Sequence, residues 1–326
     1  MNSKLSNEIK AEAKNLGFFA CGISKAEPVE EHEADRFRKW LASGSNAGMA
    51  YMNNYTDMRL DPRLIMEGLK SIVSVALNYA PAKHFGHDSY KIASYALGKD
   101  YHDIVKNKLR RLAEKFGFDK YRVFCDSGPV IERYWAVKSG IGWIGRNSQL
   151  IIPKAGSMFF LGELFVDIEL DYDKPINPRC GSCHACIDAC PTKALGHFAS
   201  SESEEHDKSY NFNAALCLSY QTIENRGEIP QDIAEKMGDT IYGCDRCQAA
   251  CPWNRFAQPN NTPELQPSDM LMAMDKEGWK QLNIEKYREL FKGSAVKRAK
   301  YSGLMRNIKA VEENEKREEK DKQGQA

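Results

Sequence analysis

Residues 180–191 read Cys-Gly-Ser-Cys-His-Ala-Cys-Ile-Asp-Ala-Cys-Pro, and this stretch determines how the second half of the chain is organised. Its four cysteines follow the spacing C-x2-C-x2-C-x3-C-P. In this spacing the first three cysteines let one short loop hold three corners of a 4Fe-4S cube, while the fourth, next to a proline, points at a second cluster. The stretch therefore predicts two clusters rather than one.

The remaining ligands come from a second cysteine group, which consists of Cys217, Cys244, Cys247 and Cys251, the last followed by Pro252. Since the fourth cysteine of each group serves the other cluster, as in bacterial two-cluster ferredoxins, we assign the ligands crosswise. Cluster one takes Cys180, Cys183, Cys186 and Cys251, and cluster two takes Cys190, Cys217, Cys244 and Cys247. A pair of zinc sites is the alternative, but tetrahedral zinc is not usually held by three evenly spaced cysteines and a fourth before proline.

The composition is that of a globular protein with no general attraction for polyanions. The chain has 326 residues, 42% of them hydrophobic, and a formal net charge of +1, so a nucleic-acid site must be a local patch. Eight of the ten cysteines are crowded between Cys180 and Cys251, and no signal peptide or membrane-spanning run is evident. We therefore expect metal ligation in a cytoplasmic protein rather than disulfides. Cys21 and Cys125 are interpreted as small core residues.

The first 173 residues alternate between helical and strand patterns. Helical stripes are expected at residues 5–16, 34–41, 105–116 and 131–139, and strand-like runs at 18–23, 72–79, 121–125, 149–152 and 158–168. Alternation of this kind predicts an α/β domain over residues 1–173, with the last two runs completing its sheet.

The texture of the chain changes after residue 173. Residues 174–260 are rich in Cys, Pro and Gly and are expected to form a ferredoxin-like module with two 4Fe-4S clusters. The polar stretch Ala199–Ser209 is expected to be a surface loop. Residues 261–326 follow as a short helical C-terminal segment, whose mixed-charge end, residues 312–326, is expected to be a solvated tail.

Two motif matches are discounted by their context. Residues 140–145, Gly-Ile-Gly-Trp-Ile-Gly, match the dinucleotide fingerprint G-x-G-x-x-G, but a helical stretch precedes them and a strand-like stretch follows. We expect these glycines to permit close backbone approach to a packed neighbour or a cofactor. Asp100-Tyr101-His102 begins like the cobalamin signature D-x-H-x-x-G, but residue 105 is Val, so no histidine ligand of cobalt is predicted.

Several further segments, taken in order with the cysteines, resemble one family. They are residues 49–52, Arg59 with residues 61–63, residues 98–102, 126–133 (Asp-Ser-Gly-Pro-Val-Ile-Glu-Arg), 140–147, 156–157 with 160–163, 217–227, and 242–245. Together they resemble epoxyqueuosine reductase, which carries out the last step of queuosine synthesis on tRNA. The likeness covers roughly residues 5 to 310. The chain differs in a longer loop at residues 199–209 and in lacking the C-terminal helical repeats of some members.

The resemblance implies a fold and cofactors. The family is similar to the reductive dehalogenases, so the α/β domain is expected to bind cobalamin base-off beside the two-cluster module. Removing an epoxide oxygen as water takes two electrons and two protons, so an electron relay, a reactive metal and an acid all have a use. The cobalamin contacts implied by the resemblance are Arg59, Asp126, Leu150, Leu161, Ser219, Gln221 and Asp245.

Asp126 is the candidate acid. It follows a strand, heads a Ser-Gly-Pro turn, and corresponds to the proton donor of the family. To donate a proton at neutral pH it needs a raised pKa, through burial or through the developing alkoxide. The alternative is that Asp126 only caps its turn.

Residues 291–309 form a basic stretch with no acidic residue. Such a run is usually a solvated helix face, but the resemblance implies contacts with tRNA phosphates, with the modified base splayed out of the anticodon loop. The candidate contacts are Lys292, Lys297, Arg298, Lys300, Arg306 and Lys309.

Two other functions remain open at this point. One is a two-cluster electron-transfer protein whose α/β domain only docks a partner, although a simple carrier does not need an acid at Asp126. The other is a corrinoid reductive dehalogenase for small halides, which the basic stretch and the lack of an export signal disfavour. We expect a monomer that acts on tRNA carrying epoxyqueuosine at its anticodon loop, takes electrons from an external low-potential donor, and does not contact a membrane.

Overall fold

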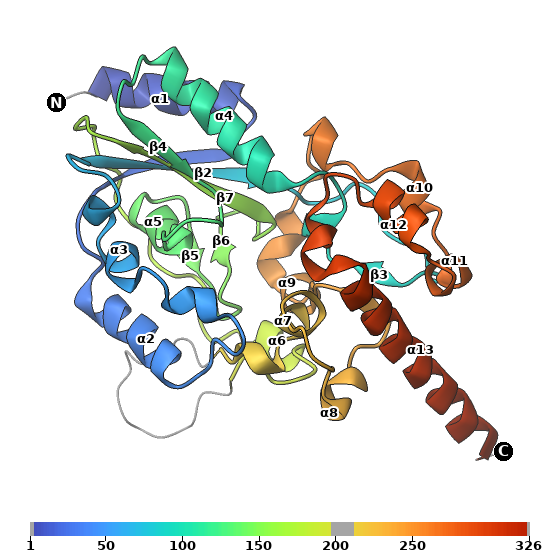
Figure 1. The fold of residues 1–326 in the computed structure, drawn as a ribbon. Coiled ribbons are helices and arrows are strands. Elements are labelled where there is room, and N and C mark those ends of the chain that lie inside the picture. The colour runs from blue at the N-terminus through green and yellow to red at the C-terminus, as the bar shows by residue number, and fades with distance from the viewer. Residues whose placement is uncertain (1–2, 197–211, 325–326) are drawn as a thin grey trace.

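A four-stranded sheet forms the centre of the N-terminal half (Figure 1). The computed structural model describes residues 3–196 and 212–324, so the expected loop at residues 199–209 lies outside the described residues. Every pair of neighbouring strands in the sheet is antiparallel. In spatial order the strands are β1 (Ala20–Lys25), β2 (Ser71–Asn78), β7 (Phe159–Val166) and β4 (Tyr121–Phe124).

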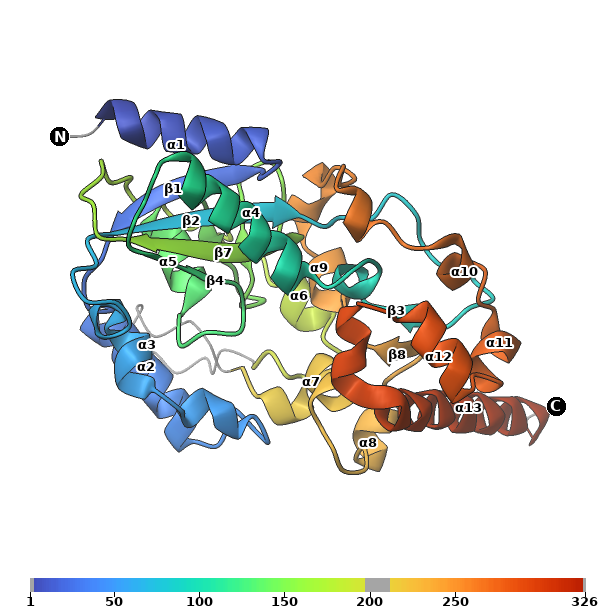
Figure 2. The ribbon, with the colours of Figure 1, turned by 45° about the horizontal axis from the view of Figure 1, so that its top comes forward.

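Helices cover both faces of this sheet, and the strand residues alternate between them (Figures 1 and 2). On one face Val73 and Leu164 pack with Leu109, and on the other Ile72 and Phe165 pack in a second cluster. Because successive strand residues point to opposite faces, both faces of β2 and β7 are buried. The first face lies under α1 (Ser3–Asn15) and α4 (Tyr101–Lys115), and the second lies on α2 (Glu31–Ala42), α3 (Thr56–Leu60) and α5 (Glu132–Lys138).

Strand β4 is shorter than its neighbour β7, so part of the edge of β7 has no strand beside it where the chain turns after β4. Strand β2 pairs with β7 along its whole length, whereas β4 pairs only as far as Glu163, and the chain then turns at Asp126. Gly162 lets β7 lie close to α4, because a Cβ atom at this position would lie 2.5 Å from a methyl carbon of Val105. The end of β4 therefore presents Asp126 beside the N-terminal turn of α4.

The run at residues 149–152 does not join the main sheet, contrary to the sequence-based expectation. Strand β6 (Leu150–Ile151) instead pairs with β5 (Trp143–Ile144) in a small hairpin that follows α5. A Cβ at Gly142 would lie 2.3 Å from the carbonyl oxygen of Ile151, so the glycine serves close packing of this hairpin. The order of helix, glycines and strand agrees with the rejection of a dinucleotide fingerprint.

The C-terminal half has its own hydrophobic core, to which the first half contributes a strand. Strand β3 (Lys91–Ile92) pairs in parallel with β8 (Thr240–Tyr242), and Tyr90 is fully buried in this second core with Trp279. Its helices are α6 (Ala185–Asp188), α7 (Leu218–Ile223), α8 (Gln231–Ala234), α9 (Arg246–Ala249), α10 (Asp269–Met272), α11 (Lys276–Lys280), α12 (Ile284–Leu290) and α13 (Lys300–Gly324).

The mixed-charge end continues α13, in which the side chains up to Glu315 are partly packed and those of residues 316–321 are exposed, as expected for a solvated end. Val311 is fully buried, and the carboxylate of Glu315 accepts hydrogen bonds from the Tyr90 hydroxyl at 2.8 Å and from the Lys276 ammonium at 2.6 Å. These contacts lie beyond the reach of a local pattern because both partners come from distant segments. Within residues 3–196 and 212–324, no helix is both long and apolar enough to span a membrane.

Candidate functional site

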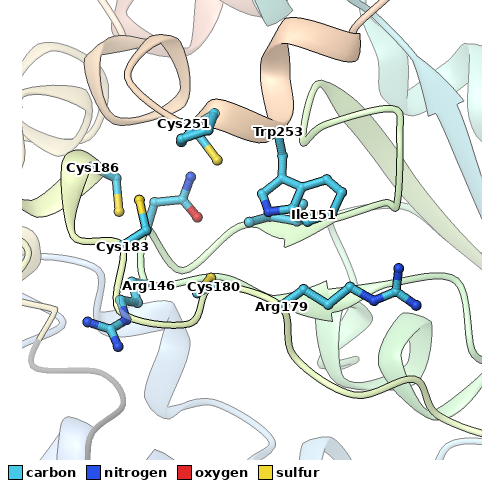
Figure 3. A pocket seen from close by; sticks show the side chains of 10 residues that line it. Arg146, Ile151, Arg179, Cys180, Cys183, Cys186, Cys251 and Trp253 are labelled. Carbon is cyan, nitrogen blue, oxygen red and sulfur yellow. The ribbon is translucent and has the colours of Figure 1, made fainter.

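Four cysteines line a single cavity, shown in Figure 3. They are Cys180, Cys183, Cys186 and Cys251, the set assigned to cluster one. Three come from α6 and the loop before it, and the fourth follows α9. In Figure 3 their sulfur atoms turn toward the same space, and the indole N–H of Trp143 donates to the Cys180 sulfur at 3.5 Å. This arrangement suits thiolates around one inorganic core.

The other four cysteines gather beside the first set. They are Cys190, Cys217, Cys244 and Cys247, which interact electrostatically with one another. Burial and the neighbouring thiols raise the pKa of Cys244 to about 11 and raise that of Cys247 further. Since several thiolates crowded in a buried place repel one another, a cationic iron–sulfur core is the kind of group that would offset their charge.

Asp126 is held by contacts to both its backbone and its side chain. Its backbone is left-handed, with φ 58°, and its N–H donates to Oε1 of Glu132. The hydroxyl of Tyr101 donates to Oδ2 of Asp126 at 2.8 Å, and Nε2 of His102 lies 3.4 Å from the same oxygen. The carboxylate is therefore oriented although 63% of its side-chain surface is exposed.

In this state Asp126 is a carboxylate, and the exchangeable proton lies on His102. Desolvation by the surrounding chain raises the pKa of Asp126. The hydrogen bonds from His102 and Tyr101 lower it by more, so the net pKa of Asp126 is below the usual range. Burial lowers the pKa of His102, but Asp100 and Asp126 raise it to about 9. The raised pKa expected for Asp126 is therefore wrong for this state, because a cationic neighbour stabilises the charged form.

Asp245 approaches the same region from the second half of the chain. It follows Cys244, and its Oδ2 accepts the backbone N–H of Ser94 at 2.7 Å. Burial raises the pKa of Tyr95, and the charges of Asp126 and Asp245 both add to this shift, so Tyr95 lies near both carboxylates. A redox cofactor between these residues would contact the carboxylate of Asp126, to which His102 can pass a proton, and the second cysteine group, and such an arrangement suits cobalamin.

Of three other residues implied for this cofactor, one lies at the Asp126 turn and two lie in an apolar cluster. The guanidinium of Arg59 donates to the carbonyl oxygen of Gly128 at 3.4 Å, which places it over the turn of Asp126. Leu150 and Leu161 belong to one buried apolar cluster. Their side chains are packed within the protein, so their contribution to a cofactor would come through the backbone or through apolar cover.

Ser219 and Gln221 lie on α7, directly after Cys217. Gln221 is buried and its amide nitrogen donates to the carbonyl oxygen of Ala215. Its side-chain oxygen accepts from Asn225 at 2.6 Å. The polar atoms of Gln221 thus already have partners within their own segment, and they position α7 beside the second cysteine group.

The basic stretch divides into exposed groups and one structural residue. Five side chains are exposed, namely Lys292, Lys297, Arg298, Lys300 and Lys309. Arg298 pairs with Glu224 at 2.7 Å and lies over the ring of Tyr51, and both Arg298 and Tyr51 feel the charge of Asp126. Arg306 is different, because its guanidinium donates to the carbonyl oxygens of Gln221, Asn225 and Gly227.

Sequence reasoning passed over three titratable residues of this site. His102 was considered only as a cobalt ligand, although the acidic residue two positions before it was a sign of a charged partner. Glu132 and Glu163 lie in segments that resemble the family, but the sequence pattern assigned them no role. The signal available for Glu163 was a single carboxylate inside the strand-like run at residues 158–168.

Known proteins resemble both parts of the chain. The family model described as "Epoxyqueuosine reductase QueG, DUF1730" matches residues 59–127, and the one described as "4Fe-4S double cluster binding domain" matches residues 179–254. The second match confirms the expectation of two 4Fe-4S clusters. The epoxyqueuosine reductase of Cellulophaga algicola is 46% identical over 309 residues, which are 94% of this chain and 97% of that protein.

Solved structures agree with these relatives. A crystal structure of epoxyqueuosine reductase with an epoxyqueuosine-modified tRNA-Tyr stem loop is 27% identical, with a TM-score of 0.82 over 94% of this chain and 80% of that chain. The Bacillus subtilis enzyme, with its catalytic loop swung out of the active site, is 27% identical, with a TM-score of 0.81 over 94% of this chain and 81% of that chain.

Proposed function

The chain belongs to the epoxyqueuosine reductase family, and on this premise we propose that it reduces epoxyqueuosine in tRNA to queuosine. The observation that carries the proposal is the exposed carboxylate of Asp126, which His102 and Tyr101 hold, with Tyr95 near both this carboxylate and Asp245. An electron carrier has no use for an oriented acid in this place. No observation favours the dehalogenation of small halides.

The two clusters held by the cysteines would carry electrons inward from the surface. We assign Cys180, Cys183, Cys186 and Cys251 to cluster one, and Cys190, Cys217, Cys244 and Cys247 to cluster two. Cys183 is exposed whereas Cys190 is buried, so an external low-potential donor would reach cluster one first. The clusters, when bound, supply one-electron transfer at low potential.

Cobalamin would lie between cluster two and Asp126. We propose contacts from Arg59 and Asp126 on one side, from Ser219, Gln221 and Asp245 on the side of the second cysteine group, and from the hairpin and strand residues Leu150 and Leu161. When bound, cobalamin supplies a cobalt centre able to attack or reduce the epoxide carbon. We propose binding base-off without a histidine on cobalt, since His102 is already held by Asp100 and Asp126.

His102 and Asp126 would deliver the protons. Opening the epoxide and releasing its oxygen as water consumes two electrons and two protons. His102 transfers its Nε2 proton to Oδ2 of Asp126, and Asp126 donates it to the departing oxygen, whose developing negative charge makes it the stronger base. His102 then regains a proton from solvent, and a second transfer completes the water. Because a relative's catalytic loop has been seen swung out, we include movement of the Asp126 turn in this proposal.

The tRNA would approach over the exposed basic side chains near Asp126. A relative has been crystallised with a modified tRNA stem loop, and we propose that Lys292, Lys297, Arg298, Lys300 and Lys309 contact phosphates of the same kind of substrate. Arg306 is left out because backbone carbonyl groups already occupy its donors. We propose a monomer that works in the cytoplasm, where its tRNA substrate is found.

Mass analysis of tRNA nucleosides tests the proposal. Reconstituted protein, loaded with clusters and cobalamin and chemically reduced under anaerobic conditions, should convert epoxyqueuosine to a nucleoside that has lost one oxygen. Asp126→Asn should lower this rate by about a hundredfold or more, the usual range for a lost general acid, while retaining about eight irons. Asp103→Asn, which changes an exposed carboxylate of α4, should leave the rate unchanged. Failure of fully loaded wild-type protein to form queuosine would contradict the proposal.

A further inference from the structure

A single carboxyl group is buried in the apolar face of the sheet that lies on α5. Glu163 on β7 pairs in register with Phe124 of β4 and Ser74 of β2, and its side chain is 0% exposed. Neither of its oxygens meets a conventional hydrogen-bond donor among the described residues, and the hydroxyl of Ser74 is likewise without a partner there. An unpaired ionised carboxylate in such a place costs several kcal/mol, so Glu163 is expected to hold a proton.

The carboxyl group of Glu132 faces that of Glu163. Glu132 is the first residue of α5, and the two carboxyl groups interact directly. Burial first, and then the charge of Glu132, raises the pKa of Glu163 well above its usual range. Burial and the charge of Asp126 also raise the pKa of Glu132, despite the opposing effects of Arg133 and of the hydrogen bonds that Glu132 accepts. Glu163 therefore holds the last proton of the pair and donates a hydrogen bond to the carboxylate of Glu132.

Glu132 also contacts the turn that carries the acid. Its Oε1 atom accepts the backbone N–H of Asp126, the residue whose backbone is left-handed. Non-glycine residues adopt this conformation only when their surroundings hold them there. A chain of contacts thus runs from the buried Glu163, through Glu132, to the backbone of Asp126.

We propose that Glu132 and Glu163 are positioning residues for the reduction, which share a proton and thereby hold the Asp126 turn in its working conformation. The proposal rests on the proposed function of Asp126 as the acid. The other charged and titratable groups that face the pair are Asp126 and Cys125 at the end of β4 and Arg133 on α5, and behind them His102 faces Asp126 and Lys106 faces Cys125.

The shared proton makes the turn sensitive to alkaline pH. Once the shared proton is lost, the carboxylates of Glu132 and Glu163 repel each other. Glu132 then moves away and no longer accepts the hydrogen bond from the backbone N–H of Asp126. Glu163→Gln cannot lose a proton but still offers an N–H to Glu132, so it should abolish this sensitivity and keep the rate. Glu163→Leu offers no donor and should lower the single-turnover rate constant by about tenfold to a hundredfold, the usual effect of a displaced catalytic group.

Two measurements test the proposal on the full chain. The first is the single-turnover rate at saturating tRNA between about pH 6 and about pH 9.5, the range in which the groups concerned titrate. Wild-type protein should lose rate as the Glu132–Glu163 pair loses its last proton, whereas Glu163→Gln should show only the decline due to His102. The second is hydrogen exchange of the peptide that contains Asp126, which should accelerate with pH beyond the chemical rate in wild type but not in Glu163→Gln.

The exchange measurement needs no turnover, so it separates this proposal from the proposed function. Glu114→Gln, which changes an exposed glutamate of α4, is the matched control and should behave as wild type. Iron content and circular dichroism identify any variant that has failed to fold. The proposal is overturned if Glu163→Gln keeps the wild-type pH dependence in both measurements, or if it is as slow as Glu163→Leu while retaining its clusters.

Discussion

His102 lies with its Nε2 atom 3.4 Å from Oδ2 of Asp126, while its Nδ1 atom is 2.6 Å from Oδ1 of Asp100. An imidazole between two carboxylates stays protonated at neutral pH, because both neighbours stabilise the cation. The pair therefore combines a stored proton with a base that can receive it. It also explains how an acid with a lowered pKa can still serve a reduction that needs protons.

Removal of His102 should change both the stability and the pH dependence of the protein. Its folded-state pKa of about 9 exceeds the unfolded value of 6.5, so its stabilising effect is complete below about pH 6.5 and disappears as the pH rises through 9. His102→Gln should be less stable than wild type by on the order of 2 kcal/mol near pH 6 and equal to it above about pH 9.5. Anaerobic thermal unfolding at several pH values measures this difference.

The same variant should reduce epoxyqueuosine at least about tenfold more slowly at neutral pH, because Asp126 loses its proton source. His32→Gln is the control, since its side chain is 70% exposed on α2. Identical pH dependence of stability in wild type and His102→Gln would contradict the assignment of the charge to His102.

The crosswise assignment of the cysteines can be tested by pairs of substitutions. Cys180→Ser with Cys251→Ser removes two ligands from the same cluster, so about four of eight irons should remain. Cys180→Ser with Cys190→Ser removes one ligand from each cluster and should disturb both. Iron analysis and electron paramagnetic resonance after reduction distinguish the two outcomes.

A sequential assignment, in which Cys190 belongs with the other cysteines of residues 180–191, predicts the reverse order of iron loss. Cys21→Ser is the control, because Cys21 lies on β1 in the sheet and should leave all eight irons in place. Equal iron contents in the two double variants would exclude both assignments.

The exposed lysines should contribute to tRNA affinity through charge. Lys297→Glu with Lys300→Glu should raise KM for the modified tRNA by about tenfold and leave kcat nearly unchanged, since phosphate contacts position the substrate without entering the chemistry. The slope of affinity against salt concentration should also become shallower. Lys4→Glu on α1 is the control, because Lys4 is 91% exposed and α1 lies far from α13, at the other end of the molecule (Figure 1). An unchanged KM would remove this surface from the binding site.

Arg306 should behave differently from its basic neighbours. Its guanidinium joins α13 to three carbonyl groups in the segment that follows Cys217. Arg306→Ala leaves these acceptors without a donor and should reduce the free energy of unfolding by about 2 to 4 kcal/mol. Thermal unfolding should show the loss, whereas Lys309→Ala, one turn along α13 with an exposed side chain, should change little. An increase in KM without a loss of stability would instead assign Arg306 to tRNA binding.

The elements with strong local patterns could be predicted from the sequence, and those that depend on distant partners could not. The expected helices and the runs of β2 and β7 are present because long apolar periodicity survives in any context. The run at residues 149–152 was wrongly added to the main sheet, since a short apolar run carries no information about its pairing partner. The helical character of the C-terminal segment was predicted, but the packing of Glu315 in its mixed-charge part was not, because it depends on Tyr90 and Lys276.

The candidate site shows the same division. Cysteine spacing alone predicted two clusters, because the spacing by itself determines which sulfur atoms one short loop can place around a cluster. The proton on His102 was not predictable, since it depends on an Asp126 that the fold brings 3.4 Å away from it. Glu163 looked like one polar residue in a strand, and only the sheet register and the start of α5 reveal its neighbour.

The short ladder between β3 and β8 has a consequence for inheritance. Residues 91–92 complete a strand pair whose other member lies between the ligands of cluster two, and Tyr90 fills a core built mainly from the second half. A gene fragment that encoded only the cysteine-rich half would lack this strand and would leave apolar surface exposed. A fragment of this chain that carried only the electron relay should therefore be less stable than the relay in the whole protein. Substitutions where the two halves meet would then be expected to call for matching substitutions on the other side.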